Sequence, residues 1–422
     1  MIFTANAGKI LNFKEEFMKN AVKKFLAMML AGVMSVSLMA CGSSGSGAAS
    51  TDGAASSEKA GKNCTIGVAF YQDSGLATEA TKAYLDNMAD TLNCKFKYTV
   101  LSQTDEGVNL TKIQELIASG VDGIICTMDS GTAAIVQECE AAGVYIGGYL
   151  CDYDISYTQA YDAVFKNDHF VGTAIDGYAP DNVVIGQQMF DSLLEYNERN
   201  ADAPITHVSL AIFPVWAFPA QTLAAQQFIA AVDEYNKTAD VQITCDPLNE
   251  ETDVLAFAPM DSTYFAKHEG IQAIMSFAAG TGFVYPVMVQ TGNDKNIKLF
   301  TTGFDGGEEK NFGSAGAQTY QQNCVTAVET ITYPLVLLLN KINGVEFKDQ
   351  PEDAERVSCD QFIMNSDEDM AAFQKNIYFT ANASDALFTP EEVLNMTAYA
   401  NPDATYEQLK KSISTLTVDS LK

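Results

Sequence analysis

Arginine is almost absent from this chain. Only Arg199 and Arg356 occur in 422 residues, and Lys and Arg together number 25 against 54 Asp and Glu, a formal net charge of −29. This balance excludes a nucleic-acid partner, which must be held by clustered basic side chains. The shortage of guanidinium groups also leaves little material for bidentate binding of phosphates or carboxylates.

Histidine is scarce too, and the patterns that build metal or catalytic sites are missing. The three histidines, His169, His207 and His268, are scattered, and no Cys-x-x-Cys pair occurs, so we expect no metal and no cofactor. There is no Gly-x-Ser-x-Gly elbow and no phosphate-binding loop. The stretch 280–282 lacks the third glycine of a dinucleotide fingerprint, so we expect the protein not to be an enzyme.

Apolar residues, in contrast, are plentiful. They make up 47% of the sequence, and 10% of residues are aromatic. A chain with this composition and length can bury a large core, which excludes intrinsic disorder. On a prior of about 150 residues per domain, the length predicts two or three domains.

The N-terminal region carries an export signal. Residues 18–41 begin with three lysines and continue with an apolar run that is too short to span a membrane comfortably. Translation is expected to start at Met18, because residues 1–17 have no role in such a signal.

The signal ends in Leu38-Met39-Ala40-Cys41, which resembles the lipobox of bacterial lipoproteins. In a lipobox the cysteine becomes the lipidated first residue of the mature chain; the alternative is an ordinary signal peptide with a chance cysteine. The Gly/Ala/Ser-rich residues that follow, 41–62 with the cysteine, are expected to be a flexible tether. We therefore expect 1–40 to be removed and the protein to lie outside the cytoplasm, lipid-anchored to the membrane of a Gram-positive cell.

Eight cysteines follow Cys41, and export makes disulfides possible. Cys126 and Cys139 are expected to be small core residues. Cys64 and Cys94 each precede a predicted strand, and the two strands would be parallel neighbours in the fold described below. A disulfide between them is the less favoured of two alternatives.

Strand and helix patterns alternate along the chain from residue 65. Four strands separated by helices are predicted first, and a second block of the same kind starts near residue 183. Such alternation implies parallel sheets covered by helices on both faces. Between the blocks, residues 151–181 lose the rhythm and are expected to hold the first crossing between two lobes, a surface insertion being the alternative.

Several segments together resemble the type I periplasmic binding proteins of ABC transporters, the ribose and galactose binding-protein kind. These segments are 66–70, 113–125, 141–144, Asp181-Asn182 with Gly186, and 302–306. The resemblance covers residues 64 to 345. It implies an α/β fold of two Rossmann-like lobes with parallel sheets, joined by a three-crossing hinge and closing on a small ligand, usually a sugar.

The resemblance also implies domain boundaries. Lobe 1 is expected at 63–150 plus about 323–347, and lobe 2 at 151–322 plus about 348–400. Residues 401–422 are expected to form a C-terminal helix.

The ligand-binding residues implied by the resemblance follow predicted strands. They are Tyr71, Asp73, Asp129, Asp305 and Gln322. Asp accepts hydrogen bonds from sugar hydroxyls and aromatic rings cover apolar sugar faces. For each Asp the alternative is a helix N-cap.

The sequence departs from the family pattern where ligand contacts are expected. Ala224 stands in place of a usual Arg, and Ala278-Ala279 in place of Asn-Asp. Phe213 and Trp216, by contrast, place aromatics in the loop after a strand, where Trp216 is expected to stack on ligand rather than pack under the loop. A neutral ligand with an apolar face is therefore favoured over an anionic one.

We expect a monomeric, lipid-anchored solute-binding protein that delivers a small neutral ligand, foremost a sugar, to an ABC permease. The alternatives are a binder of nucleosides or other aromatic-faced solutes, and a ligand sensor for a membrane receptor. A transcription regulator with the same lobes is excluded because an export signal stands where its DNA-binding helices would be.

Overall fold

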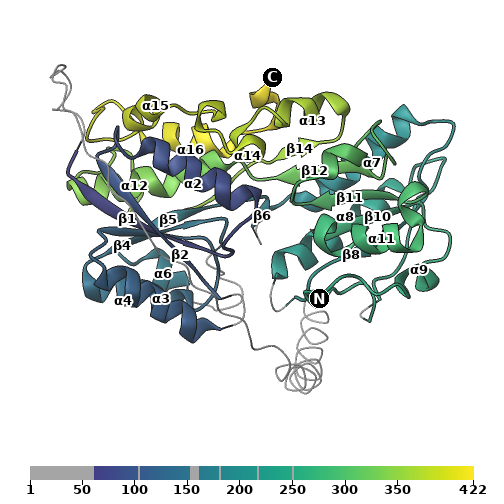
Figure 1. The fold of residues 1–422 in the computed structure, drawn as a ribbon, viewed down its shortest axis with the longest axis horizontal. Coiled ribbons are helices and arrows are strands. Elements are labelled where there is room, and N and C mark those ends of the chain that lie inside the picture. The colour runs from purple at the N-terminus through teal and green to yellow at the C-terminus, as the bar shows by residue number, and fades with distance from the viewer. Residues whose placement is uncertain (1–60, 103–104, 153–160, 180–181, 216–217, 250) are drawn as a thin grey trace, which may run out of the picture. The chain divides into compact units, whose positions relative to one another are not determined.

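The structure is a computed structural model that describes residues 61–102, 105–152, 161–179, 182–215, 218–249 and 251–422. These residues belong to one compact unit, Ser56–Lys422. The expected lipidation site Cys41, the signal and most of the tether lie outside the described residues. Two sheets, each flanked by helices, organise the unit (Figure 1).

The first sheet has six strands, all parallel, in the order β13-β5-β4-β3-β1-β2. Its strands are β1 (Cys64–Phe70), β2 (Cys94–Val100), β3 (Gly123–Cys126), β4 (Tyr145–Tyr149), β5 (Phe170–Ile175) and β13 (Arg356–Ser358). Its helices are α2 (Leu76–Met88), α3 (Glu106–Ala118), α4 (Thr132–Ala142), α6 (Tyr161–Phe165), α12 (Thr332–Asn343) and α16 (Tyr406–Ser414). Helices α3 and α4 cover one face, and α2 and α12 the other (Figure 1).

The second sheet also has six strands, in the order β14-β12-β11-β10-β8-β9, and only β14 runs antiparallel. Its strands are β8 (His207–Ala211), β9 (Thr244–Cys245), β10 (Ala273–Ala279), β11 (Lys298–Thr302), β12 (Tyr320–Val325) and β14 (Phe362–Met364). The helices that follow or flank them are α7 (Ile185–Arg199), α8 (Pro219–Tyr235), α9 (Tyr264–Lys267), α10 (Gly280–Phe283), α11 (Tyr285–Thr291) and α13 (Asp367–Phe373). Short 3₁₀ turns are η1 (Asn293–Lys295), η2 (Glu308–Asn311) and η3 (Val328–Ile331). The predicted doubly covered parallel sheets are confirmed.

Local sequence explains several of these elements. Strand β1 is buried along almost its whole length, as expected of a strand covered on both faces. The Asp105 side chain caps α3 by accepting from the backbone N–H of Gly107 and Val108, at 2.9 and 3.1 Å. Pro334 lies in the first turn of α12, where its missing N–H costs no helical hydrogen bond.

The chain passes between the sheets at three hinge segments. The first joins β5 to α7 through the small hairpin β6 (Tyr178–Ala179) and β7 (Asn182–Val183), the second joins β12 to α12, and the third joins β13 to β14. The expected boundary at residue 151 is wrong, because β5 pairs with β4 and so keeps residues up to 175 in the first lobe. The return at 323 is also too early, since β12 pairs in the second sheet up to Val325.

The C-terminal segment, residues 367–422, passes between the lobes twice more, which the sequence did not predict. From α13 on the second lobe it reaches α14 (Ile377–Thr380) against α2, then η4 (Ala383–Asp385), α15 (Pro390–Asn395) and α16 on the first lobe. It ends at η5 (Val418–Leu421), which packs on α13 and β14 of the second lobe. Residues 348–400 are therefore not a continuation of the second lobe alone, and residues 401–422 hold two short helices.

The cysteine and histidine expectations have different outcomes. Cys64 and Cys94 are register partners in parallel neighbours, as predicted, and both are buried free thiols. The histidines are less scattered than the sequence suggests, because His207 and His268 both bond to Asp246. Within the described ranges, no cluster of His, Cys, Asp or Glu is arranged to hold a metal, and no helix there is long and apolar enough to cross a membrane.

Candidate functional site

The candidate site lies at the carboxyl ends of the parallel strands, the place where ligands bind in open α/β sheets. Tyr71 directly follows β1 and Asp129 follows β3 in the first lobe, whereas Phe213 and Asp305 follow β8 and β11 in the second. The topology thus brings residues that are far apart in sequence to the facing edges of two sheets.

The loop that carries Asp305 is organised by a buried carboxylate, Glu308. One Glu308 oxygen accepts from the backbone N–H of Asp305 at 2.7 Å and from the Thr281 hydroxyl. The other accepts from the backbone N–H of Gly306, also at 2.7 Å. Gly306 and Gly307 have φ of 102° and 106°, a conformation that favours glycine, so this tight loop depends on them.

Asp305 itself is exposed, and its carboxylate is free for a ligand. Within the described part of the chain no hydrogen bond reaches its side-chain oxygens. The surrounding protein nevertheless desolvates the carboxyl group and raises its pKa. The pKa of Tyr71 rises to about 12, because the phenol is buried and because the Asp305 charge lies near it. The Asp305 loop lies close to the first lobe, because a Cβ added at Gly306 would come within 3.3 Å of Leu76, the first residue of α2.

The two other predicted aspartates, Asp129 and Asp73, lie in the first lobe. Asp129 is exposed, and its carboxylate accepts from the backbone N–H of Asp152 at 2.9 Å, which ties the end of β3 to the loop after β4. Asp73 is exposed near the start of α2. None of the three aspartates is a helix N-cap: glycines take that position for α2, α4 and η2.

Phe213 belongs to a cluster of aromatic rings in the second lobe. Its ring stacks on Phe257 with centroids 5.1 Å apart, and meets Phe283 edge-on at 5.2 Å and Phe218 at 5.3 Å. Phe213 is itself buried, while Phe218 is 42% exposed. Phe213 thus supports an aromatic wall, of which Phe218 is the exposed member. Trp216 lies outside the described residues.

Gln322 is placed differently from a surface ligand contact. It lies within β12, before the second hinge segment, and is 1% exposed. Its amide oxygen has no hydrogen-bond partner in the described structure.

Both arginines are engaged away from Asp305. Arg356 pairs with Asp152 at 2.5 Å, and Arg199 donates to the Asn365 carbonyl at 2.8 Å. Ala224, which stands where the family pattern has an arginine, is fully buried in α8 against α7. The geometry thus provides a carboxylate and aromatic rings at the strand ends of the second lobe.

Sequence reasoning missed two residues that shape the site, Glu308 and Tyr378. The glycine pair before Glu308 was a usable signal of a tight loop next to a carboxylate. Tyr378 comes from the C-terminal segment, and its pKa is raised by burial and by the charges of Tyr71 and Asp305. No local sequence signal marks Tyr378, because its position depends entirely on how that segment packs.

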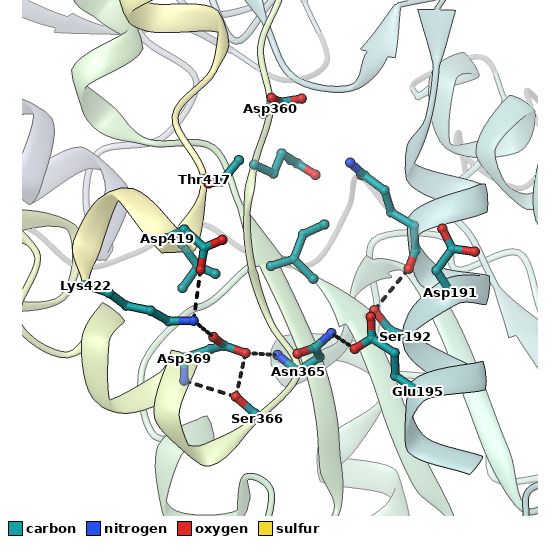
Figure 2. A pocket seen from close by; sticks show the side chains of 14 residues that line it. Asp191, Ser192, Glu195, Asp360, Asn365, Ser366, Asp369, Thr417, Asp419 and Lys422 are labelled. Atoms are coloured by element: carbon teal, nitrogen blue, oxygen red, sulfur yellow. Dashed lines mark hydrogen bonds and ion pairs between the residues drawn. The ribbon is translucent and has the colours of Figure 1, made fainter. Parts of the chain in front are cut away.

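A separate hollow of about 550 Å³ lies between α7, β14 and η5 (Figure 2). Its lining contains no aromatic residue and includes several carboxylates that are already bonded. Asp369 pairs with Lys422 at 2.8 Å and accepts from Ser366 at 2.6 Å, and Glu195 accepts from Asn365 (Figure 2). This hollow is a poor match for a neutral ligand with an apolar face.

No family model and no curated protein matches this sequence, but solved structures match its fold. An ABC transporter solute-binding protein from Agrobacterium vitis, bound to alpha-D-tagatopyranose, has a TM-score of 0.53 at 13% identity and covers 73% of this chain and 96% of its own. A glucose-galactose binding protein from Geobacillus stearothermophilus has a TM-score of 0.52 at 13% identity, with coverages of 72% and 98%.

A third neighbour is an ABC transporter solute-binding protein from Bacillus halodurans C-125 with bound myo-inositol. It has a TM-score of 0.51 at 11% identity and covers 75% of this chain and 98% of its own. At such identities the likeness concerns the course of the backbone, and it agrees with the strand orders of the two sheets. The chain therefore has the fold of the type I periplasmic binding proteins.

Proposed function

We propose that this protein binds a small neutral solute, foremost a sugar, between its two lobes. The observation that carries the proposal is the unbonded Asp305 carboxylate, held on a glycine loop that lies against Leu76 of the other lobe and whose charge helps to raise the pKa of Tyr71. A carboxylate accepts hydrogen bonds from sugar hydroxyls, and a phenol can donate or accept. The sugar, polyol and glucose-galactose ligands of the structural neighbours support the same solute class.

An anionic solute is disfavoured by electrostatics. The two arginines bond to other groups, and the protein around Asp305 desolvates its carboxyl group and raises its pKa, which disfavours further negative charge there. A second negative charge beside it would raise that pKa further.

The N-terminal sequence supports a place for this activity in the cell. With its lipobox-like end and Gly/Ser-rich tether, the leader fits a monomeric lipoprotein on the outer face of a Gram-positive membrane. There it would hand its ligand to an ABC importer, or, as a second possibility, signal to a membrane receptor. Mass spectrometry of the protein and of its Cys41→Ala variant tests the anchor. The wild type should carry the lipid on Cys41, and the variant should carry none.

A solute with an aromatic face, such as a nucleoside, is the second candidate. The exposed ring of Phe218 in the Phe213 cluster favours it, because base and phenyl rings stack well. The thermal-unfolding screen described next contains both sugars and nucleosides and so separates the two candidates.

Thermal unfolding of the full-length chain in mild detergent, with and without solutes, tests the proposal. The panel contains D-glucose, D-galactose, D-tagatose, D-arabinose, myo-inositol, adenosine and uridine. A ligand at 100 times its Kd stabilises the folded state by about 2.7 kcal/mol and so raises the midpoint. Asp305→Asn should abolish the shift, whereas Asp240→Asn, at an exposed site on the same lobe, should keep it.

A shift by a nucleoside alone would replace the sugar by the second candidate. No shift with any solute, or a full shift in the Asp305→Asn variant, would contradict the proposed site.

A further inference from the structure

The C-terminal segment lies directly against the loop that carries Asp305. Phe304, the residue before Asp305, is 2% exposed. Its ring meets that of Phe373 at 5.0 Å, almost edge-on, and that of Phe379 at 5.8 Å. Both partners belong to the C-terminal segment, which follows the third hinge segment. Residues close to the C-terminus therefore pack against the start of the Asp305 loop.

The C-terminal segment is also attached to the first lobe and to the second hinge segment, which joins β12 to α12. Helix α14, which contains Phe379, packs on α2. Just before it, the Asn376 amide donates to the Glu329 carboxylate at 3.2 Å, and the backbone N–H of Leu387 donates to the same oxygen at 2.9 Å. Glu329 is fully buried in η3, within the hinge passage. Phe379 is therefore anchored on the first lobe and on the hinge, and not on the second lobe.

Tyr378, the neighbour of Phe379, takes part in the same packing. It is 7% exposed, and its ring lies 5.4 Å from that of Phe373. Tyr149, Phe304, Phe373 and Tyr378 belong to one continuous hydrophobic core that also includes β1 and α12 residues. The core thus runs from the first lobe through the C-terminal segment to the Asp305 loop.

We propose that Phe379 is a positioning residue for ligand binding, and that Asp367–Thr380 forms a brace that sets the place of Asp305 relative to Tyr71. The inference rests on the proposed function for its ligand, but its structural basis does not depend on that ligand. Phe304 precedes Asp305 and Phe379 is held on α2, so a movement of the Asp305 loop away from the first lobe would loosen the contact between these two rings. The brace thereby favours the arrangement in which the Asp305 loop lies against the first lobe, and it lowers the ordering cost of binding.

The first experiment needs no ligand. It measures amide hydrogen exchange at residues 303–308 in the full-length chain and in Phe379→Ala and Phe379→Leu. The N–H groups of Asp305 and Gly306 are held by Glu308, so weaker packing of Phe304 should open these bonds more often. We expect roughly tenfold faster exchange in Phe379→Ala and a smaller rise in Phe379→Leu. Phe388→Ala, a half-buried Phe of the same segment without a ring contact to Phe304, is the matched control and should leave this loop unchanged.

The second experiment measures binding of whichever panel sugar shifts the wild-type midpoint. Phe379→Ala should weaken binding about tenfold, which corresponds to about 1.4 kcal/mol, Phe379→Leu should restore most of the affinity, and Phe388→Ala should leave it unchanged. A merely structural role would lower the unfolding midpoint of Phe379→Ala but leave its affinity unchanged at a temperature where the variant is folded.

The two outcomes can be told apart. Unchanged exchange at 303–308 in a folded Phe379→Ala protein would overturn the brace, and so would faster exchange without loss of affinity. If no panel sugar binds the wild type, the proposed function fails, while the exchange result still decides whether the brace exists.

Discussion

His268 lies buried between two carboxylates, and its protonation should make the stability of the protein depend on pH. The side chain is 3% exposed; its Nδ1 lies 2.8 Å from Asp246 and its Nε2 lies 2.8 Å from Asp253. Because both ring nitrogens lie within hydrogen-bond distance of carboxylate oxygens, the site favours the imidazolium, in which both nitrogens donate. Burial alone would lower the pKa of His268, but the bonds to Asp253 and Asp246 outweigh it and raise the pKa above its usual value.

The sign and size of the effect follow from linkage. A histidine with a raised pKa stabilises the folded state fully below its unfolded pKa, about 6.5, and this contribution is lost as pH rises through the folded pKa. Between those two values only the folded state holds the proton, so stability falls by up to about 1.4 kcal/mol per pH unit. His268→Gln should remove this slope.

His268→Ala should also lower stability directly. It leaves Asp253, which is fully buried, without its cationic partner, a change that costs about 3–5 kcal/mol in buried pairs. We expect the lower end, because Asp253 still accepts from the Thr252 hydroxyl and the Asn249 N–H.

Urea unfolding followed by circular dichroism between pH 5.5 and 8.5 measures both effects. His169→Gln is the matched control, since His169 has no carboxylate bond to its ring in the described structure and should keep the wild-type slope. Wild-type stability that is constant or rises above pH 6.5, or a His268→Gln variant with an undiminished slope, would refute the reasoning.

Three further predictions concern packing and buried acids, each measured by urea unfolding. Glu308→Ala should cost about 1–3 kcal/mol by leaving two backbone N–H groups without acceptors, and Glu308→Gln, which keeps one oxygen, should cost less. Burial raises the pKa of Glu329 above its value in the unfolded chain, about 4.3, so its contribution to the free energy of unfolding should fall as pH rises above 4.3. The stability of Glu329→Gln relative to the wild type should therefore increase from pH 4.5 to 7, and a stability difference that does not change with pH would contradict this. Gly147→Ala would place a Cβ 2.7 Å from that of Pro334 and should cost about 1–3 kcal/mol, whereas Gly107→Ala, which meets only a side-chain oxygen, should cost nothing; equal effects would exclude overpacking.

Much of the fold could be predicted because its main signals are local. The alternation of strands and helices, the glycine ends of helices such as Gly143, and the parallel pairing of the strands at Cys64 and Cys94 all appear as predicted. The strand-end position of Asp305 follows from the same pattern, since it directly follows Thr302-Gly303-Phe304.

The features that were missed depend on contacts between distant residues. Strand β5 was hidden behind an irregular stretch, and only its pairing with β4 shows which lobe it completes. His207 and His268 look unrelated in the sequence, but Asp246 brings them together. Tyr378 and Phe379 reach the site through tertiary packing of the C-terminal segment, which no periodic pattern announces.

The repeated passage of the chain between the lobes has a consequence for the order of folding. The first lobe needs α16 on its surface, and the second needs η5 against β14, only a few residues before Lys422. Neither lobe can therefore reach its final packing until the last part of the chain has been synthesised. During synthesis, the apolar surfaces that α14 and α16 later cover stay exposed, so that refolding should be slow and a chain that lacks its last turns should be prone to aggregation.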